Sequence, residues 1–599
     1  MSEQRIITRE EVQVEHTWKV EDIYETDEKW EEDYALSFEQ MEHLQSYKGR
    51  LSQSYQVLKE YLDQYTALAQ KMEKLYVYAN QRYHQDTGNS FYQDLSDRSS
   101  SAMSRFESTV SFMTPEILAI DVAILEQWME QKEMSAYKKF LQEMTRQREH
   151  VLSAELEHML AETSDMGNAP SDIFSMFDNA DIHFDDVINE AGERLPLTHG
   201  RFLSYLSSSD RVLRKSAFTN TYKAYKEHKN TLSAIYRANL KQEWFYAKAR
   251  KYESSMAMSL DNSNVPIPVY KNLIASVHEH LPLMHRYMKI RKERLGVDEL
   301  HMYDIYTSMV ANVDKKISYE EAKQIVYESL KPLGEEYRSI VKEGFENRWI
   351  DVYENQGKRS GAYSWGAYGI HPYVLLNHQE NLNSMFTLAH EMGHAMHSYY
   401  SDKAQPFLYA GYKIFVAEVA STCNEAILMD YLLKQTTSKE EKDYLINYFM
   451  EQFRTTLYRQ TMFAEFEMIT HEMIQNNQTL TAENLCQIYY DLNVKYYGED
   501  MVIDEEIAME WARIPHFYTP FYVYQYATGY SAAIAISRKI LAGDEKAKEG
   551  YFKFLQGGCS MDPIRLLKLC DVDMLTKEPV NSALKLFEEL LDQFENNEG

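Results

Sequence analysis

A possible metal-binding motif lies in the middle of the chain, where His390 and Glu391 are followed by His394 in the sequence HEMGH. The surrounding apolar residues have helical spacing and predict a helix, with Asn383 or Ser384 as its cap. Residues four apart share one face of a helix, so both imidazoles can bind one metal ion. Glu391 lies about 100° round the helix and is placed to act as a base rather than a ligand. This combination is the one that zinc-dependent hydrolysis requires.

A third ligand must come from another part of the chain. The longer motif HExxHxxGxxH needs glycine at position 397, but His397 stands there, and we expect it to pack beside or support the site. The next segment, FVAEVASTCNEAILMDYLL, is an apolar helix with a polar stripe. Carboxylates on such a helix are costly to bury unless they are paired or bind a metal. Glu418 is the better ligand candidate, whereas Glu425 either orients a ligand histidine or is an ordinary surface glutamate.

One stretch before the motif lacks a helical period. Residues 360–377 read SGAYSWGAYGIHPYVLLN and predict two short antiparallel strands, Ala362–Tyr368 and Tyr373–Leu376. A strand edge near Ala362 and Tyr363 can align an extended peptide through main-chain hydrogen bonds. The alternative is a hairpin with a purely structural role.

Composition restricts the remaining possibilities. The 599 residues include 63 Lys and Arg against 92 Asp and Glu, a net charge of −29. This balance argues against binding to nucleic-acid phosphates. Glycine (21) and proline (13) are scarce, and together with the helical patterning they predict a mainly α fold. Two predicted capping boxes, Ser318-x-x-Glu321 and Ser438-x-x-Glu441, precede amphipathic segments.

The chain has no long uninterrupted apolar run and no apolar segment near its first residue, so we expect no membrane span and no secretory signal. Four well-separated cysteines form no CxxC pair: Cys423, Cys486, Cys559 and Cys570. They predict neither a disulfide framework nor a zinc ribbon, and the expected location is the cytoplasm.

Taken together, TLAHEMGHAMH, FVAEVASTCNEAIL, SGAYSWGAY and RIPHFYTPFYVYQYATG resemble the thimet oligopeptidase family of zinc metallopeptidases, and within it the oligoendopeptidase F branch. The resemblance covers roughly residues 190–590. It implies one Zn²⁺ per chain, bound by His390, His394 and Glu418, with Glu391 as the catalytic base. It also implies an elongated helical body with a deep channel, zinc at the channel floor and a small antiparallel sheet on its wall.

A tyrosine-rich segment follows His516. A phenol or an imidazole can donate a hydrogen bond to the oxyanion that forms when an amide is hydrolysed. If the segment is helical, Tyr522, Tyr526 and Tyr530 lie on one stripe. By resemblance to the family we expect Tyr526 to stabilise the oxyanion, with His516 and Tyr522 assisting and Tyr530 binding substrate. A tyrosine-rich core helix is the alternative.

The expected function is zinc-dependent endopeptidase activity on short, unfolded peptides. We expect residues 1–189 to form a helical part of the channel wall and residues 190–599 to form the catalytic domain. Two alternatives stay open. The first is a dipeptide-releasing exopeptidase of the same family, and the second is a peptide-binding protein without catalytic activity.

Overall fold

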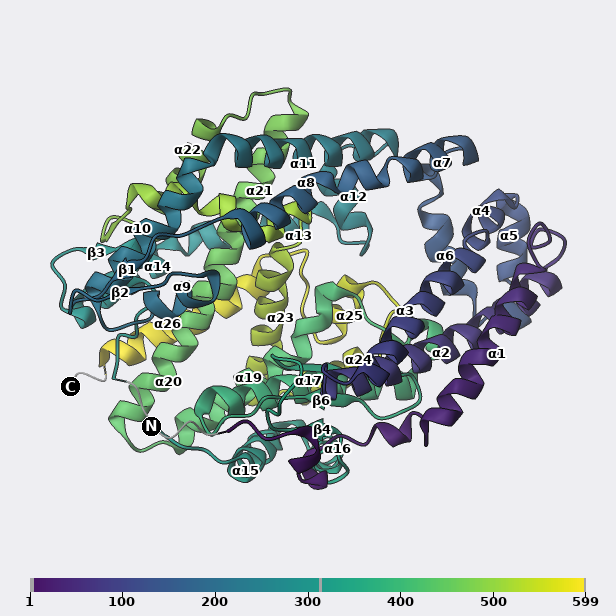
Figure 1. Ribbon diagram of the computed structural model, residues 1–599, viewed down its shortest axis with the longest axis horizontal. Helices are drawn as coiled ribbons and strands as arrows, with labels where there is room; N and C mark the ends of the chain where they lie inside the picture. Colours follow the sequence, from purple (N-terminus) through teal and green to yellow (C-terminus); the bar gives the residue numbers. More distant parts are fainter. Residues whose placement is uncertain (1–4, 312–314, 597–599) are drawn as a thin grey trace. The chain divides into compact units, whose positions relative to one another are not determined.

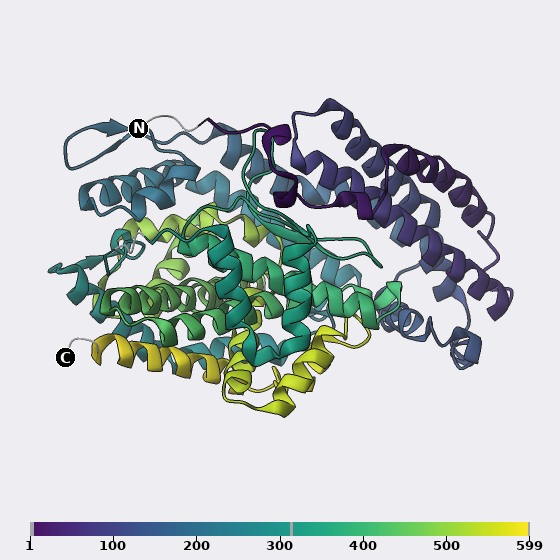
Figure 2. The same ribbon diagram turned by 90° about the horizontal axis from the view of Figure 1, so that it is seen from below.

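The computed structural model describes residues 5–311 and 315–596, which form two compact units. The first unit comprises residues 5–151, 315–428 and 536–571, and the second comprises residues 152–311, 429–535 and 572–596. Both are built mostly from helices, which confirms the predicted fold class (Figures 1 and 2). The expected division of roles at residue 189 stays a prediction.

The first unit contains long helices at its N-terminal end and a small sheet in its middle segment. Its elements are α1 (Asp27–Gln45), α2 (Tyr55–Gln85), α3 (Ser90–Val110), α4 (Met113–Ala119), α5 (Val122–Met129), α6 (Lys138–Arg146), α15 (Tyr319–Ser329), α16 (Glu335–Glu346), β4 (Ile350–Asp351), β5 (Tyr363–Trp365), β6 (Tyr373–Leu375), α17 (Leu382–Ala404), α18 (Phe407–Ala410), α24 (Glu545–Leu555) and α25 (Pro563–Leu569).

The second unit is almost entirely helical. Its elements are α7 (Ala154–Glu162), α8 (Ser164–Met176), β1 (Val187–Ile188), β2 (Arg194–Leu195), α9 (His199–Leu206), α10 (Arg211–Glu227), α11 (Lys229–Ala249), α12 (Ser255–Asp261), α13 (Ile267–Glu279), α14 (Leu281–Leu295), β3 (Leu300–His301), α20 (Lys439–Gln452), α21 (Arg459–Gln475), α22 (Ala482–Tyr497), β7 (Met501–Val502) and α26 (Glu578–Asn596). Two helices continue from one unit into the other, α19 (Ile414–Gln435) and α23 (Tyr524–Leu541).

The N-terminal helices pack through buried aromatic and aliphatic side chains. Helices α1, α2 and α3 lie side by side in both views (Figures 1 and 2). Trp30 of α1 is fully buried, and its indole N–H donates to the carbonyl oxygen of Leu75 in α2 over 2.9 Å. The serine half of each predicted capping box is confirmed, since Ser318 and Ser438 accept the N3 amides of α15 and α20.

The small sheet of the first unit has three strands in the order β4-β6-β5. Strands β5 and β6 are antiparallel, as predicted, with Ser364 opposite Val374, but both are shorter than expected. Strand β5 ends at Trp365, and further on the Tyr368 amide donates to the Glu73 carboxylate of α2. Strand β4, which pairs in parallel with β6, was not predicted, so the sheet is mixed rather than antiparallel. Strand β5 is at the edge and pairs only with β6 among the described strands.

The end of β4 is fixed by a buried ion cluster. Both carboxylate oxygens of Asp351 accept from the Arg9 guanidinium, at 2.9 and 2.5 Å, and Lys358 Nζ lies 2.7 Å from Oδ1. The side chains of Asp351 and Lys358 are fully buried. Burial alone raises the pKa of Asp351, but Lys358 and Arg9 outweigh it and hold that pKa below its usual range. The N-terminal segment is thereby attached to the sheet.

Among the described residues, no single helix is long and apolar enough to cross a membrane. The bent pair Ser90–Ala119 and Val122–Met129 passes the length and composition test only when the two are taken together.

Candidate metal centre

Helix α17 carries the HExxH motif. It begins at Leu382 and is capped by Asn381, whose side chain accepts from the Ser384 amide over 2.9 Å. The predicted caps, Asn383 and Ser384, are therefore wrong, because the helix starts a few residues earlier. Ser384 instead accepts from the Gln379 amide and stabilises the turn before the helix.

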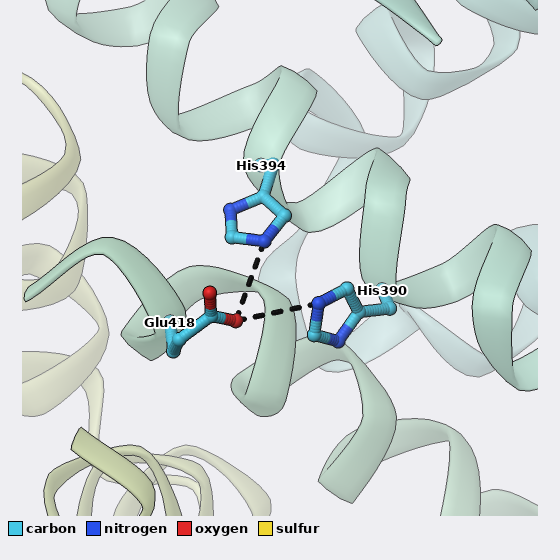
Figure 3. A group of neighbouring side chains, drawn as sticks. All are labelled: His390, His394 and Glu418. Carbon is cyan, nitrogen blue, oxygen red and sulfur yellow. Dashed lines mark ion pairs between the residues drawn. The ribbon is translucent and has the colours of Figure 1, made fainter. Parts of the chain in front are cut away.

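The two motif histidines and Glu418 of α19 converge on one point (Figure 3). Glu418 Oε2 lies 3.3 Å from His390 Nε2 and 3.4 Å from His394 Nε2. One ligand atom from each residue lies within 4.8 Å of the others. The Glu418 side chain is 39% exposed, so the cluster is open to solvent on one side. Two imidazole nitrogens and one carboxylate oxygen in this arrangement fit a catalytic zinc site, which keeps one position open.

A glycine between the two histidines permits this convergence. A Cβ atom on Gly393 would lie 2.5 Å from Ser421 Cα and 2.7 Å from the Ala420 carbonyl oxygen. Helices α17 and α19 therefore touch backbone to backbone at this position. Any larger residue would push Glu418 away from the histidines.

Contacts around the ligands hold them in position. Glu425 Oε1 lies 3.4 Å from His390 Nδ1, the ring nitrogen that does not face Glu418. Ser421 Oγ donates to Glu418 Oε2 over 3.1 Å. Asn424 donates to the Ala389 carbonyl oxygen over 3.1 Å and so connects α19 to α17. Ser421 is on the predicted polar stripe, although the sequence suggested no role for it, and Asn424 was not predicted; both are buried.

Charge in the cluster favours a cation. Burial lowers the pKa of His390, but Glu418 and Glu425 outweigh it and raise that pKa to about 10. Burial raises the pKa of Glu418, but the two histidines hold it far below its usual range. Glu391 is 6% exposed, and burial raises its pKa despite the nearby imidazoles. One of its carboxylate oxygens, Oε2, has no hydrogen-bond partner among the described residues.

His397 lies further along the same helix. Its ring is fully buried and stacks on Tyr412 at 3.8 Å between centroids, with Phe554 at 5.1 Å. Burial lowers its pKa to about 3, so the ring is neutral. Among the described residues neither ring nitrogen has a hydrogen-bond partner, and packing is the role that this geometry favours.

The edge strand β5 lies beside the start of α17. A cavity of about 290 Å³ is bounded by Ala362, by the chain after β6 and by the first turn of α17. The Tyr363 hydroxyl is 2.7 Å from His84 Nδ1, and its ring packs on Trp18 at 6.2 Å. The side chain of Tyr363 therefore belongs to the packing of the unit, and only its backbone is placed for strand pairing.

Three of the predicted C-terminal residues meet in the second unit. The Tyr526 hydroxyl is 3.4 Å from His516 Nε2, and the Tyr522 ring lies 6.0 Å from the His516 ring and 5.6 Å from the Tyr526 ring. Burial lowers the pKa of His516. Helix α23 begins at Tyr524, so Tyr522 precedes the helix rather than lying on its stripe. Tyr530 is 4% exposed and packs on Phe453 at 5.1 Å instead.

A helical body with two histidines one turn apart, a glutamate between them and a carboxylate from a second helix defines a metallopeptidase of the HExxH class. Comparisons with known proteins identify the family. The peptidase family M3 profile matches residues 204–586, and the oligopeptidase F profile matches residues 116–184. The chain belongs to peptidase family M3.

Relatives match along nearly the whole chain. Oligopeptidase PepF of Bacillus subtilis is 47% identical over 588 residues, covering 98% of this chain and 88% of that protein. A Chlamydophila abortus protein of known structure has a TM-score of 0.94 at 34% identity, covering 99% of this chain and all of the other. The structure of oligoendopeptidase-F from Enterococcus faecium has a TM-score of 0.74 at 36% identity, covering 95% and 99%.

Proposed function

We propose that this metallopeptidase is a zinc-dependent endopeptidase that hydrolyses internal bonds of short, unfolded peptides. The observation that carries the proposal is the convergence of His390, His394 and Glu418 beside the buried Glu391. The names of the oligopeptidase and oligoendopeptidase relatives support the same substrate class.

His390, His394 and Glu418 would hold one Zn²⁺ per chain. When bound, zinc supplies positive charge beside the scissile carbonyl and a more acidic water. Glu425 lies against the far nitrogen of His390 and fixes its orientation, as carboxylates behind metal-ligating histidines do. The His397 ring stacks on Tyr412 and takes no part in binding the metal.

Glu391 acts as the general base. It accepts a proton from the water that attacks the scissile carbonyl and delivers it to the leaving nitrogen. Tyr526 donates a hydrogen bond to the oxyanion, and His516 and Tyr522 orient it from their positions beside its ring. Tyr530 is buried, so any role of Tyr530 in substrate binding is indirect.

The peptide backbone pairs with the start of the edge strand β5, since the Trp365 carbonyl oxygen at its end already accepts from Gln81 over 3.1 Å. The backbone of Ala362 and Tyr363 supplies the hydrogen-bonding groups, while the Tyr363 ring stays packed against the unit. The net charge of −29 favours neutral or basic peptides and disfavours nucleic acid or anionic membrane surfaces as partners. The four cysteines are free thiols, which supports a reducing location such as the cytoplasm.

Substitution Glu391→Gln tests the assignment of the base. With zinc bound, we expect kcat for a quenched fluorescent peptide to fall by about 1,000-fold or more, because the amide cannot accept the proton. Glu346→Gln on α16, an exposed glutamate of the same unit, is the matched control. Wild-type kcat in zinc-loaded Glu391→Gln would disprove the mechanism.

Product lengths distinguish the endopeptidase from a dipeptide-releasing exopeptidase. An endopeptidase cleaves C-terminally amidated peptides as readily as free ones and yields fragments of several lengths. Mass spectrometry of a mixed peptide library, with and without chelator, measures both. Loss of cleavage on amidation, with dipeptides as the main products, would identify an exopeptidase.

A further inference from the structure

A tight turn in the second unit leads into the Tyr526 helix. Phe521, the residue before Tyr522, has a φ of +52°, a left-handed conformation that costs a bulky residue about 1–2 kcal/mol. Such a conformation persists only where the surroundings impose it. Tyr522 directly follows this residue, and α23 begins at Tyr524. The backbone conformation of the turn therefore sets the orientation of the Tyr522 side chain and the direction of the helix.

Side chains from two helices hold the backbone of the turn. The buried Phe521 amide donates to Glu467 Oε1 of α21 over 2.6 Å. Ser259 of α12 donates through Oγ to the carbonyl oxygen of Pro520 over 2.7 Å. The C=O and the N–H of the single Pro520–Phe521 peptide group are thus each bound by a side chain from far away in the sequence.

The Phe521 ring is fixed as well. It is 2% exposed and packs between Tyr270 of α13, at 5.7 Å, and His471 of α21, at 4.5 Å. Tyr270 donates in turn to the Ala464 carbonyl oxygen of α21 over 2.6 Å. Helix α21 therefore supports both the ring and the amide of the strained residue.

Glu467 is an unusual choice for this position. Its side chain is fully buried, and Oε2 has no hydrogen-bond partner among the described residues. Burial raises its pKa well above the usual range, the Phe521 amide opposes this rise, and Glu243 adds to it. Placing an incompletely bonded carboxyl in a core costs stability, which an apolar side chain of similar size avoids.

We propose that Glu467 is a positioning residue for catalysis: its hydrogen bond to Phe521 holds the strained turn that sets Tyr522 and Tyr526 beside His516. Glu467 acts through the turn, because its carboxylate oxygen Oε1 accepts from the Phe521 amide. The inference rests on the proposed function of Tyr526 as oxyanion donor.

Substitutions at Glu467 separate the hydrogen bond from the packing. Glu467→Gln keeps the size of the side chain and an acceptor for the Phe521 amide, so we expect kcat within about 3-fold of wild type. Glu467→Met fills the space but cannot accept, and we expect kcat to fall by about 10- to 100-fold, with KM changing less. Zinc content and melting temperature are measured for both. If Glu467→Met lowers only the melting temperature and leaves kcat unchanged, Glu467 is merely structural and the proposal is wrong.

A double substitution distinguishes failure of this inference from failure of the proposed function. If Glu467 acts through Tyr526, adding Glu467→Met to Tyr526→Phe lowers kcat by less than about 3-fold beyond Tyr526→Phe alone. If the loss of kcat in the double variant equals the product of the two single losses, the positioning role of Glu467 is wrong. Wild-type kcat in Tyr526→Phe alone would instead overturn the oxyanion assignment on which the inference rests.

Ser259→Ala provides a second route should Glu467→Met fail to fold. It removes only the bond to the Pro520 carbonyl oxygen, at the other end of the same peptide group. We expect kcat to fall by about 3- to 10-fold, again without loss of zinc, and the effect to vanish in the Tyr526→Phe background. Unchanged kcat in folded Ser259→Ala would count against a catalytic role for the turn.

Discussion

Asp351 and Glu418 lie in the same unit, and each faces two nitrogen-bearing side chains. Asp351 is fully buried between Arg9, at 2.5 Å, and Lys358, at 2.7 Å. Glu418 is 39% exposed and lies 3.3 and 3.4 Å from the nitrogens of His390 and His394. The first cluster is tightly paired and sealed from solvent. The second is looser and opens to solvent.

The partner chemistry explains why one cluster is structural and the other can bind a metal. Arginine and lysine are donors only and keep their charge, so they complete the bonding of Asp351 and leave nothing to offer a cation. When a protonated imidazole loses one proton it becomes neutral, and the lone pair on that ring nitrogen can then bind a metal ion. A carboxylate near histidines therefore indicates a metal site only when it is not also satisfied by permanent cations.

Removing the carboxylate from the open cluster has the largest expected effect. Glu418→Gln replaces an anionic ligand with a neutral one, so we expect metal content to fall and kcat/KM to drop by about 1,000-fold or more. Elemental analysis, peptide cleavage and circular dichroism measure metal, activity and fold. A fully loaded, active Glu418→Gln protein would remove Glu418 from the ligand set.

Removing the carboxylate from the sealed cluster should affect stability instead. Asp351→Asn leaves Arg9 and the buried Lys358 without their counter-charge, and we expect the free energy of unfolding to fall by about 3–5 kcal/mol. The control is Glu346→Gln, which breaks the exposed pair with Lys342 and should cost less than about 0.5 kcal/mol. Denaturant unfolding measures both. Loss of zinc from folded Asp351→Asn would contradict the separation of the two clusters.

A smaller effect is expected from the carboxylate behind the open cluster. Glu425→Gln weakens the contact with His390 Nδ1, so zinc affinity should fall by about 10- to 100-fold while kcat at saturating zinc changes little. Competition with a chelator measures the affinity, and Glu346→Gln again serves as the control. An affinity within twofold of wild type would make Glu425 an ordinary surface glutamate.

The open cluster could be predicted from sequence because its determinants are local. The spacing of His390 and His394 places both on one helical face, and Glu418 stands out as a charge on an apolar helix. The sealed cluster could not, since Arg9 and Asp351 are 342 residues apart and neither lies in a distinctive pattern. Strand β4 was missed because two residues are too few to show a period.

The tyrosine segment shows a different limit. The stripe through Tyr522, Tyr526 and Tyr530 assumed a helix that starts before Tyr522, whereas α23 begins after the strained Phe521 turn. That turn depends on Glu467 and Ser259, which come from distant helices. Local periodicity predicts that such a segment contains a helix, but long-range contacts decide at which residue the helix starts.

The smallest expected effect is the change in the free energy of unfolding at acidic pH, which tests the charge pairing in the sealed cluster. The pKa of Asp351 is held below its usual value of 3.8, so the stability it contributes is present above that pH and is lost as the pH falls through the lowered pKa. The stability difference between wild type and Asp351→Asn should therefore shrink on acidification, by at most about 1.4 kcal/mol per pH unit below pH 4. Urea unfolding at pH steps from 6 to 3 measures the difference. The free energy of unfolding of the control, Glu346→Gln, should change with pH as that of wild type does. A difference that stays constant over this range would mean that Asp351 contributes hydrogen bonds but no charge pairing.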